Sequence, residues 1–455
     1  MPSGVMSQSL YEKDFLTPEF HQSRREELRK LMPDSSISIL FTAPERNRSN
    51  DNDFQYHQNP DFYYLTGLTQ PHAVLLILKY PVKLLDLYSN EFLFIAPNNI
   101  NKEVWNGKNK TIKEMKAIAG MNSVFLTTDF YSLPVSDTDF VQILYTNLPK
   151  GIADIKNDTL DLFDLVNVFK TKFSFPPANG DSFLLSSFLK KLREIKEPQE
   201  IELMKRAISM SCEGHKEMMR IVKPGMTEYQ VQAAGEYVFK SMGSEYVGYP
   251  SICGGGENSC ILHYDANRKK LVDGDLILLD MGAEYHGYTA DVTRTLPVSG
   301  SFNIEQKVIY ELVKKAQDSA FAKCQAGNDF NAPHQAAVKV IQSGLLSLGI
   351  INDEHEYKKY FMHGTSHYLG LDVHDVGTYS ALKSGNVITV EPGIYIPANS
   401  PCETKWWNIG VRIEDDVLIT TNGYENLSVY CTSSIKTIEE LMKQDPVFLK
   451  HFDLK

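Results

Sequence analysis

One stretch, residues 275–295, constrains the fold of this chain more than any other. It reads as two apolar strands joined by a tight turn near Tyr285–His286, and each strand carries one aspartate, Asp280 and Asp291, among hydrophobic neighbours. If the hairpin turns there, the two carboxylates lie almost opposite each other, within about 5 Å. Two half-buried like charges are costly unless a cation lies between them. The stretch therefore predicts one half of a metal site.

Three later segments, residues 361–375, 387–395 and 410–417, place further ligand-type side chains among apolar residues. In chain order these are His363, His367, His374, Glu391, Arg412 and Glu414. Two Asp, two Glu and one His form an oxygen-rich donor set, which suits two hard divalent ions such as Mn²⁺ better than structural zinc. Paired ions would explain why four carboxylates are tolerated together, and such pairs can clamp a tetrahedral intermediate.

Each of these features also has a plainer explanation. The two aspartates could be turn residues, and a lone buried histidine is more often a satisfied core residue than a ligand. Glu391 could cap a turn, and Glu414-Asp415-Asp416 could be a solvated acidic edge. Residues 254–256 are three glycines without the lysine of a P-loop, so we interpret them as a flexible backbone. The joint occurrence of the ligand-type residues favours the metal site.

Composition sets the wider limits. A chain of 455 residues with 42% hydrophobic and 23% charged residues is typical of a soluble globular protein of two domains. The net charge of -11 argues against nucleic acid or an acidic membrane as partner. Six scattered cysteines without a Cys-x-x-Cys pair, and an N-terminus without an apolar signal region, indicate a cytoplasmic protein. The longest apolar run, residues 73–78, is too short to span a membrane.

Periodicity divides the chain near the turn-forming residues 175–180. Before this point helices and strands alternate, which predicts an α/β domain at residues 1–178, and helices followed by strands predict an α+β domain at residues 179–455. In the first domain we expect helices at 18–32 and 110–119 and strands at 37–42, 62–67, 73–78, 91–96 and 140–145. In the second we expect helices at 181–194, 198–222, 228–242, 304–324 and 332–348.

The motifs together resemble those of the proline-specific metallopeptidases with the pita-bread fold. Aminopeptidase P and prolidase are close members of this family, and methionine aminopeptidase is a smaller relative. The resemblance rests on residues 256–264, the Asp280/Asp291 hairpin, residues 363–367, 390–393 and 411–415. Residues 48–51 and 58–67 are similar to the N-terminal domain of aminopeptidase P.

The resemblance implies roles for individual residues. The implied metal ligands are Asp280, Asp291, His367, Glu391 and Glu414. Among them, Asp291 and Glu414 would contact both ions, Asp280 one ion, and His367 with Glu391 the other. Glu391 would also be the general base, and His263 and His374 would stabilise the oxyanion and orient the scissile carbonyl. The implied substrate-binding residues are His363, Arg412, Tyr395 and Asp51.

The activity implied by the resemblance is removal of the first residue from peptides with proline in second position. A rigid Xaa-Pro amide without an N–H group suits a close-fitting slot lined by apolar and imidazole groups. Two alternatives stay open: a prolidase that acts only on Xaa-Pro dipeptides, and a metal-free binding module on the same fold. The resemblance also implies a homo-oligomer, a dimer or tetramer, in which the loop with Trp105 could reach a neighbour. We expect Asp291→Asn, but not Asp415→Asn, to abolish activity.

Overall fold

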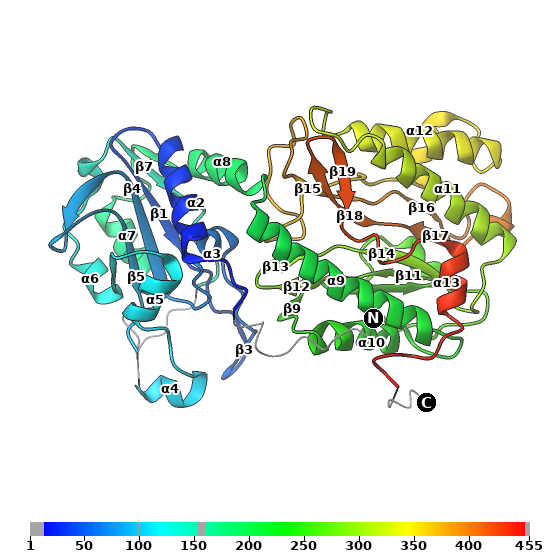
Figure 1. The fold of residues 1–455 in the computed structure, drawn as a ribbon, viewed down its shortest axis with the longest axis horizontal. Helices are drawn as coiled ribbons and strands as arrows, with labels where there is room; N and C mark the ends of the chain where they lie inside the picture. Colours follow the sequence, from blue (N-terminus) through cyan, green and yellow to red (C-terminus); the bar gives the residue numbers. More distant parts are fainter. Residues whose placement is uncertain (1–12, 99, 153–160, 451–455) are drawn as a thin grey trace. The chain divides into compact units, whose positions relative to one another are not determined.

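The computed structural model describes residues 13–98, 100–152 and 161–450 (Figure 1). The chain forms two compact units, Phe15–Leu192 and Arg193–Lys455, and Asp14 belongs to the second of them. Helix α8 (Ser182–Arg193) follows the boundary expected at residue 178, yet all but its last residue belongs to the first unit. Among the described residues no helix is both long and apolar enough to cross a membrane.

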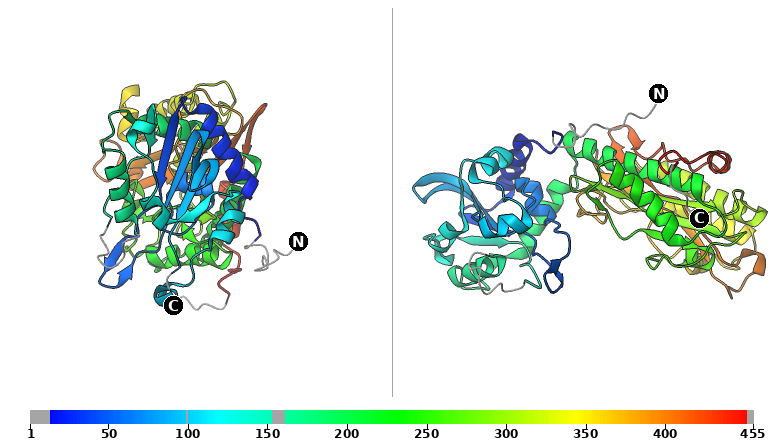
Figure 2. Two further views of the ribbon diagram at one scale, coloured as in Figure 1. Left: turned by 90° about the vertical axis from the view of Figure 1, so that its left-hand side faces the viewer. Right: turned by 90° about the horizontal axis from the view of Figure 1, so that it is seen from below.

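The first unit is built on a six-stranded mixed sheet with the order β6-β5-β4-β1-β7-β8, and Figure 2 (left) shows its strands side by side. The strands are β1 (Ser36–Phe41), β4 (Ala73–Leu84), β5 (Leu87–Ile95), β6 (Val124–Leu126), β7 (Gln142–Tyr145) and β8 (Gly180–Asp181). The central pairs β1–β4 and β4–β5 are antiparallel, and the outer pairs are parallel. The strands predicted at 37–42, 73–78, 91–96 and 140–145 are thus confirmed.

Helices cover both faces of this sheet. The helices of this unit are α2 (Pro18–Leu31), α3 (Pro60–Thr66), α4 (Ile100–Asn106), α5 (Ile112–Ala119), α6 (Thr127–Tyr131), α7 (Leu162–Lys172) and α8, and a short hairpin is formed by β2 (Asn47–Ser49) and β3 (Asn52–Asp53). Alternate residues such as Ile37, Ile39 and Val74 pack with Phe169 of α7 in one apolar cluster. Side chains on a strand alternate between faces, so Ile77 and its cross-strand neighbour Glu91 lie on the opposite face, where Arg25 of α2 binds Glu91 at 2.9 Å.

The segment expected as a strand at residues 62–67 is a helix, α3, so that prediction is wrong. Its aromatic residues favour strands, but the flanking residues are strong helix signals. The side chain of Asn59 accepts a hydrogen bond from the backbone N–H of Phe62, and Pro60 occupies the first turn. Gly67, with φ of 69°, ends the helix in the left-handed conformation. Local capping therefore outweighed side-chain propensity.

The second unit combines helices with several small antiparallel sheets, as expected for an α+β domain. Its main helices are α9 (Pro198–Ile221), α10 (Glu228–Ser241), α11 (Ile304–Phe321), α12 (Ala332–Ser347) and α13 (Ile435–Leu441). Its strands are β9 (Tyr246–Val247), β10 (Ile252–Gly255), β11 (Leu276–Asp280), β12 (Ala283–Tyr285), β13 (Tyr288–Thr289), β14 (Thr293–Pro297), β15 (Val387–Val390), β16 (Gly393–Ile396), β17 (Ile409–Arg412), β18 (Asp415–Thr420) and β19 (Gly423–Asn426). The helices predicted at 198–222, 228–242, 304–324 and 332–348 are confirmed.

Two pairs of helices pack on two groups of strands in this unit (Figure 1). Helices α9 and α10 contact each other and strands β10, β12 and β13, whereas α11 contacts α12 and strands β15, β16 and β17. The first group of strands carries the aspartate hairpin, and the second leads to Glu391 and Glu414. An isolated bridge between Thr293 and Glu414 joins the two groups. The candidate site therefore lies where strands of the two halves meet.

Candidate metal centre

The aspartate hairpin exists, but its register differs from the predicted one. Strands β11 and β14 pair so that Asp280 lies opposite Thr293, not opposite Asp291. The tight turn is at His286–Gly287, between the paired residues Tyr285 and Tyr288. The turn lies one residue later than expected, so the predicted pairing is wrong by two residues. Because side chains alternate with a period of two, Asp280 and Asp291 still share one face and are diagonal neighbours.

The two aspartates are linked by a tyrosine that the sequence analysis did not identify. The Tyr249 hydroxyl lies 2.5 Å from Oδ1 of Asp280 and 2.6 Å from Oδ1 of Asp291. Both aspartates are buried, and neither lies in the turn, so the turn-residue explanation is excluded. A phenol has one proton to donate and here faces two carboxylates. The second carboxylate therefore needs a cation or a proton of its own.

Glu414 lies beside this pair and is positioned by Thr293. The Thr293 hydroxyl donates to Oε2 of Glu414 at 2.5 Å, and the Glu414 backbone N–H donates to the Thr293 carbonyl at 3.2 Å. The following residues Asp415 and Asp416 are also buried, so the solvated acidic edge considered for this run is excluded. Asp415 binds the buried guanidinium of Arg294 at 2.7 Å, and Asp416 accepts a hydrogen bond from the Asp291 backbone N–H at 3.1 Å.

His367 and Glu391 approach the aspartates from the other group of strands. Nδ1 of His367 lies 3.0 Å from the Tyr368 carbonyl, an interaction that places the Nδ1 proton on this bond and leaves Nε2 as the inner nitrogen. Nε2 is 3.4 Å from Oδ2 of Asp291 and 3.5 Å from Oε1 of Glu391. Glu391 follows β15 directly, where its backbone N–H bonds to the Thr365 carbonyl at 2.9 Å. The end of β15 therefore places Glu391 beside His367, which in turn contacts Asp291.

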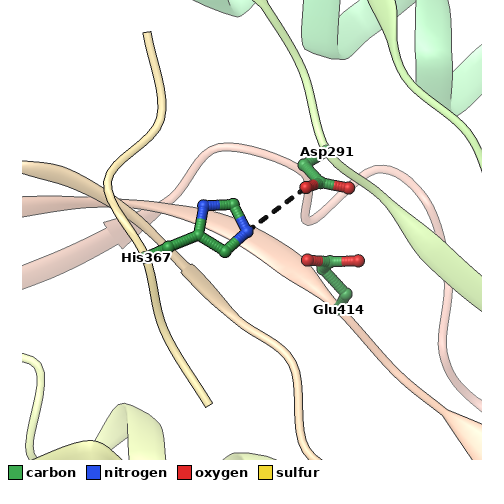
Figure 3. Close-up of side chains that lie close together, drawn as sticks. All are labelled: Asp291, His367 and Glu414. Atoms are coloured by element: carbon green, nitrogen blue, oxygen red, sulfur yellow. Dashed lines mark ion pairs between the residues drawn. The ribbon is translucent and has the colours of Figure 1, made fainter. Parts of the chain in front are cut away.

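Three of these side chains form a compact group that could hold a metal ion. Asp291, His367 and Glu414 each offer one ligand atom, and the three atoms lie within 4.8 Å of one another. Figure 3 shows the imidazole and the two carboxylates turned toward one another, with the ion pair from His367 to Asp291. Asp280 adjoins this group through Tyr249, and Glu391 adjoins it through His367. The structure thus brings together all five residues expected as ligands.

Electrostatics indicate that this group needs cations. Burial, with Asp280 nearby, raises the pKa of Asp291, and burial, with Asp291 and Glu391 nearby, raises the pKa of Glu414 well above its usual value. Burial also raises the pKa of Glu391 to about 7. Burial would lower the pKa of His367, but Asp291 and Glu391 raise it to about 9. Divalent cations between the carboxylates would relieve the repulsion, so the residues present fit a metal centre.

Asp280 differs from the other carboxylates because it has an arginine partner. Burial would raise its pKa, but Arg412, at 2.6 Å from Oδ2, and the Tyr249 hydroxyl hold the pKa below its usual value. Nη1 of Arg412 also donates to the Tyr395 hydroxyl at 2.8 Å, and that hydroxyl lies 2.8 Å from Nε2 of His363. Burial and Arg412 lower the pKa of His363 to about 3, so its ring is neutral and can accept this hydrogen bond. His363, Tyr395 and Arg412 thus form one chain that ends at Asp280.

The two remaining histidines of the prediction are exposed side chains close to this group. The ring of His374 lies 4.4 Å from the ring of His367, at an angle of 82°. Partial burial of the ring, followed by the charges of His367 and His263, lowers the pKa of His374, so both imidazoles lie close enough to act on it. Asp51 belongs to the other unit, where it is exposed at the turn between β2 and β3. Its substrate-binding role stays a prediction.

Thr293 and Tyr249 were not expected from the sequence, and they differ in how far the sequence could have indicated them. Thr293 is two residues beyond Asp291 on the same strand face, so strand periodicity alone could have identified it. Tyr249 lies between two short strands in a segment without a pattern, and only the fold brings it to the aspartates. The three glycines at 254–256 lie in regular structure: Gly254 and Gly255 end β10, and Gly256 begins the short helix η2 (Gly256–Cys260). A Cβ on Gly254 would stand 2.7 Å from the Asn258 carbonyl oxygen. These glycines permit close approach of the backbone.

Comparison with known proteins gives two family matches and many relatives. Residues 202–421 match the model of metallopeptidase family M24, and residues 21–136 match that of the aminopeptidase P N-terminal domain. A protein of Escherichia coli named Xaa-Pro aminopeptidase is 33% identical over 435 residues, which cover 92% of this chain and 97% of that protein.

Solved structures agree with this match. The structure of the Pseudomonas aeruginosa aminopeptidase PepP has a TM-score of 0.84 and 35% sequence identity, and covers 94% of this chain and 98% of its own. A variant of Escherichia coli aminopeptidase P in complex with substrate has a TM-score of 0.83 and 32% identity, with the same coverage. The pita-bread architecture expected for the second unit is thereby confirmed, together with an N-terminal domain of the aminopeptidase P kind.

Proposed function

Because this chain belongs to metallopeptidase family M24, we propose that it is an Xaa-Pro aminopeptidase, which removes the first residue from peptides with proline in second position. The observation that carries this proposal is the convergence of Asp291, His367 and Glu414 within 4.8 Å, with Asp280 and Glu391 beside them. The relatives with this name align over nearly the whole chain, and a related structure contains a substrate. A metal-free binding module would have no use for this ligand set.

In this proposal the five ligands hold two divalent ions, which supply Lewis acidity toward a water molecule and the scissile carbonyl. Glu391, between His363 at 3.5 Å and His367 at 3.5 Å, takes the proton of the attacking water and passes it to the leaving amine. His374 and His263, on the exposed side of His367, donate hydrogen bonds to the oxygen that becomes negative. Tyr249 and Thr293 hold the carboxylates in place.

Selectivity for proline would come from the chain of His363, Tyr395 and Arg412. Burial keeps the His363 ring neutral, and Tyr395 holds it from one side, so a rigid imidazole face is available to the proline ring. An Xaa-Pro amide offers no N–H group, so such a face loses no hydrogen bond when it accepts proline. The carboxylates nearby favour the positively charged amino group of the first residue.

We propose manganese as the metal because four carboxylates and one imidazole form a hard, oxygen-rich donor set. The test is to remove metal with a chelator and restore it as Mn²⁺, Zn²⁺ or Co²⁺, with bound ions counted by elemental analysis. Mn²⁺ should restore the highest kcat at two ions per chain. Full activity with one ion per chain would refute the dinuclear site, and higher activity with Zn²⁺ would refute manganese.

The activity itself is tested with matched peptides. Xaa-Pro-Xaa tripeptides should be cleaved with release of the first residue, whereas Xaa-Ala-Xaa peptides of the same length should not. Activity confined to Xaa-Pro dipeptides would make the protein a prolidase instead. Absence of both metal and hydrolysis in the purified protein would leave only the binding-module alternative.

Three finer features complete the proposal. Trp105 lies on helix α4 and not in the loop expected for it, and it is 87% exposed, which supports its use as a contact in a dimer or tetramer. Light scattering of the wild type and Trp105→Ala would test this. All six cysteines are free thiols, which supports a reducing compartment such as the cytoplasm, to be tested by cell fractionation. Asp51 should contribute to substrate binding, so Asp51→Ala should raise KM more than it lowers kcat.

A further inference from the structure

The loop that carries His263 is organised by one buried carboxylate, that of Glu228. Glu228 is the first residue of α10, and its side chain is fully buried. Oε1 accepts hydrogen bonds from the Gly255 backbone N–H at 2.8 Å and the Asn258 amide at 3.0 Å, and Oε2 accepts from the Tyr264 hydroxyl at 2.8 Å and the Lys269 backbone N–H at 2.7 Å. A carboxylate has about four acceptor positions, so these four donors occupy it completely.

All four donors come from the single segment 255–269, which leaves β10 and returns toward β11. His263 lies inside this segment as an exposed side chain, one residue before Tyr264. The carboxylate thus fixes the loop at both ends and immediately beside the histidine. Because all acceptor positions of Glu228 are hydrogen-bonded to this one loop, Glu228 stabilises the conformation of the loop and has no position left to bind a ligand.

The same loop is held on its other side by apolar contacts and by β17. Leu262 and Tyr264, which flank His263, pack on the cluster of Ile252, Leu278 and Tyr395. The hydroxyl of Ser259, in the short helix η2 (Gly256–Cys260), accepts a hydrogen bond from the Gly410 backbone N–H at 3.0 Å. Tyr264 therefore contacts both the Glu228 carboxylate, through its hydroxyl, and the apolar cluster that contains Tyr395, through its ring.

We propose that Glu228 is a positioning residue that fixes the His263 imidazole relative to the metal-ligand group. The proposal rests on the role of His263 in the proposed function. Glu228→Gln is the informative change because it keeps size and shape but offers a single oxygen acceptor. At least two of the four buried donors then lose their acceptor, and an NH₂ group is placed against them.

The chain provides a matched control in Glu217 of α9. This carboxylate is also fully buried, and it accepts hydrogen bonds from the backbone N–H groups of Val447, Phe448 and Leu449 at 2.8–2.9 Å and from Nη1 of Arg220 at 3.2 Å. Glu217→Gln therefore damages a similar network that does not include His263. Both variants should lose a similar amount of thermal stability, whereas only Glu228→Gln should lower kcat, by at least about tenfold, since one general-acid or oxyanion group is misplaced.

A double-mutant cycle separates positioning from general damage. In the metal-loaded enzyme with an Xaa-Pro-Xaa substrate, Glu228→Gln should cost less than about twofold in kcat when His263 is already alanine. Additive losses would overturn the proposal, as would an equal loss of kcat in Glu217→Gln. If His263→Ala retains full activity, the role of His263 fails and the positioning role fails with it.

Hydrogen exchange gives a readout that needs no turnover. Amides of residues 255–269 should exchange faster in Glu228→Gln and at the wild-type rate in Glu217→Gln, where residues 447–449 should exchange faster instead. If the wild type does not cleave Xaa-Pro peptides, the proposed function fails. Hydrogen exchange still decides whether Glu228 fixes the loop. An unchanged exchange rate of residues 255–269 in Glu228→Gln would overturn the positioning role. Should Glu228→Gln not fold, Tyr264→Phe removes one of the four bonds and is expected to show the same pattern, more weakly.

Discussion

Nη2 of Arg412 lies 2.6 Å from Oδ2 of Asp280, and both side chains are buried. The same guanidinium donates to the hydroxyls of Thr293 and Tyr395. Arg412 therefore supplies positive charge to one aspartate of the hairpin from a strand of the other half of the unit. Asp280 is stabilised as an anion without any metal, whereas burial and neighbouring carboxylates destabilise the charge on Asp291 and Glu414.

Arg412→Met is expected to destabilise the metal-free protein by about 3–5 kcal/mol, because loss of one partner leaves a buried charge uncompensated. Saturating Mn²⁺ should recover most of this loss, since a bound cation takes over the compensation of Asp280. Urea unfolding in chelator and in Mn²⁺ measures both values. Arg412→Lys keeps the charge but not the planar fork, so its loss should be smaller. An equal loss in both conditions would argue against Asp280 as a ligand.

Asp291→Asn and Asp415→Asn should separate a ligand from a structural carboxylate. Asp291→Asn is expected to abolish activity and to lower the number of bound ions. Asp415 faces the buried Arg294 at 2.7 Å, so Asp415→Asn should keep its metal while the melting temperature falls. Elemental analysis and thermal unfolding report the two effects. Loss of metal in Asp415→Asn would show that the bridging metal ligands have been assigned to the wrong carboxylates.

Tyr249→Phe is expected to affect the metal-free protein more than the loaded one. Without the hydroxyl, the carboxylates of Asp280 and Asp291 lose a shared donor, which costs about 1–3 kcal/mol in the buried state. Bound cations reduce this cost, so the rise in melting temperature on adding Mn²⁺ should be larger than in the wild type. Tyr310→Phe is the control, because its hydroxyl donates to the Ser433 carbonyl in either state. An unchanged metal response in Tyr249→Phe would contradict the argument.

Glu200 should make the stability of the protein depend on pH near neutrality. Burial raises the pKa of Glu200 to about 7, and its carboxyl contacts the Tyr288 hydroxyl at 2.9 Å. The folded pKa lies above the unfolded one, so the contribution to stability is complete below about pH 4.5 and is lost as the pH rises through about 7. Each unit of pKa difference is worth about 1.4 kcal/mol.

Glu200→Gln should remove this dependence, because a neutral amide does not ionise. The free energy of unfolding of wild type minus variant, measured in urea, should therefore fall between pH 5 and pH 8. Glu202→Gln on the same helix is exposed and should give a difference that is flat with pH. A flat difference for Glu200→Gln as well would show that Glu200 ionises normally.

Much of the candidate site was predictable because its ligands interrupt apolar strands. Charged residues such as Asp280, Asp291 and Glu391 have no reason to lie in such runs unless they bind something, so their joint occurrence predicts a metal centre. The strands that carry them have a strong periodic pattern, and the capped helices α9 and α11 were predicted within a few residues for the same reason.

The errors arose where local patterns compete or where tertiary contacts decide. Asn59 and Gly67 form caps that turned an aromatic segment into a helix. The hairpin register depends on the turn at His286–Gly287, which differs by a single position from the expected turn. Tyr249 and Glu228 act on residues more than 25 positions away in sequence, and no local spacing marks such contacts.

The pairing of β11 with β14 also determines which changes in length this hairpin can accept. One residue inserted into a single arm would turn every side chain beyond it to the opposite face, so that Asp280 and Asp291 could no longer meet. One residue added to each arm lengthens the tip and leaves the pairing of Asp280 with Thr293 unchanged. The tip itself is buried, since Tyr285, His286 and Tyr288 are at most 3% exposed and β12 pairs with β9. Even a balanced lengthening would therefore displace packed residues, and this hairpin should accept few changes in length.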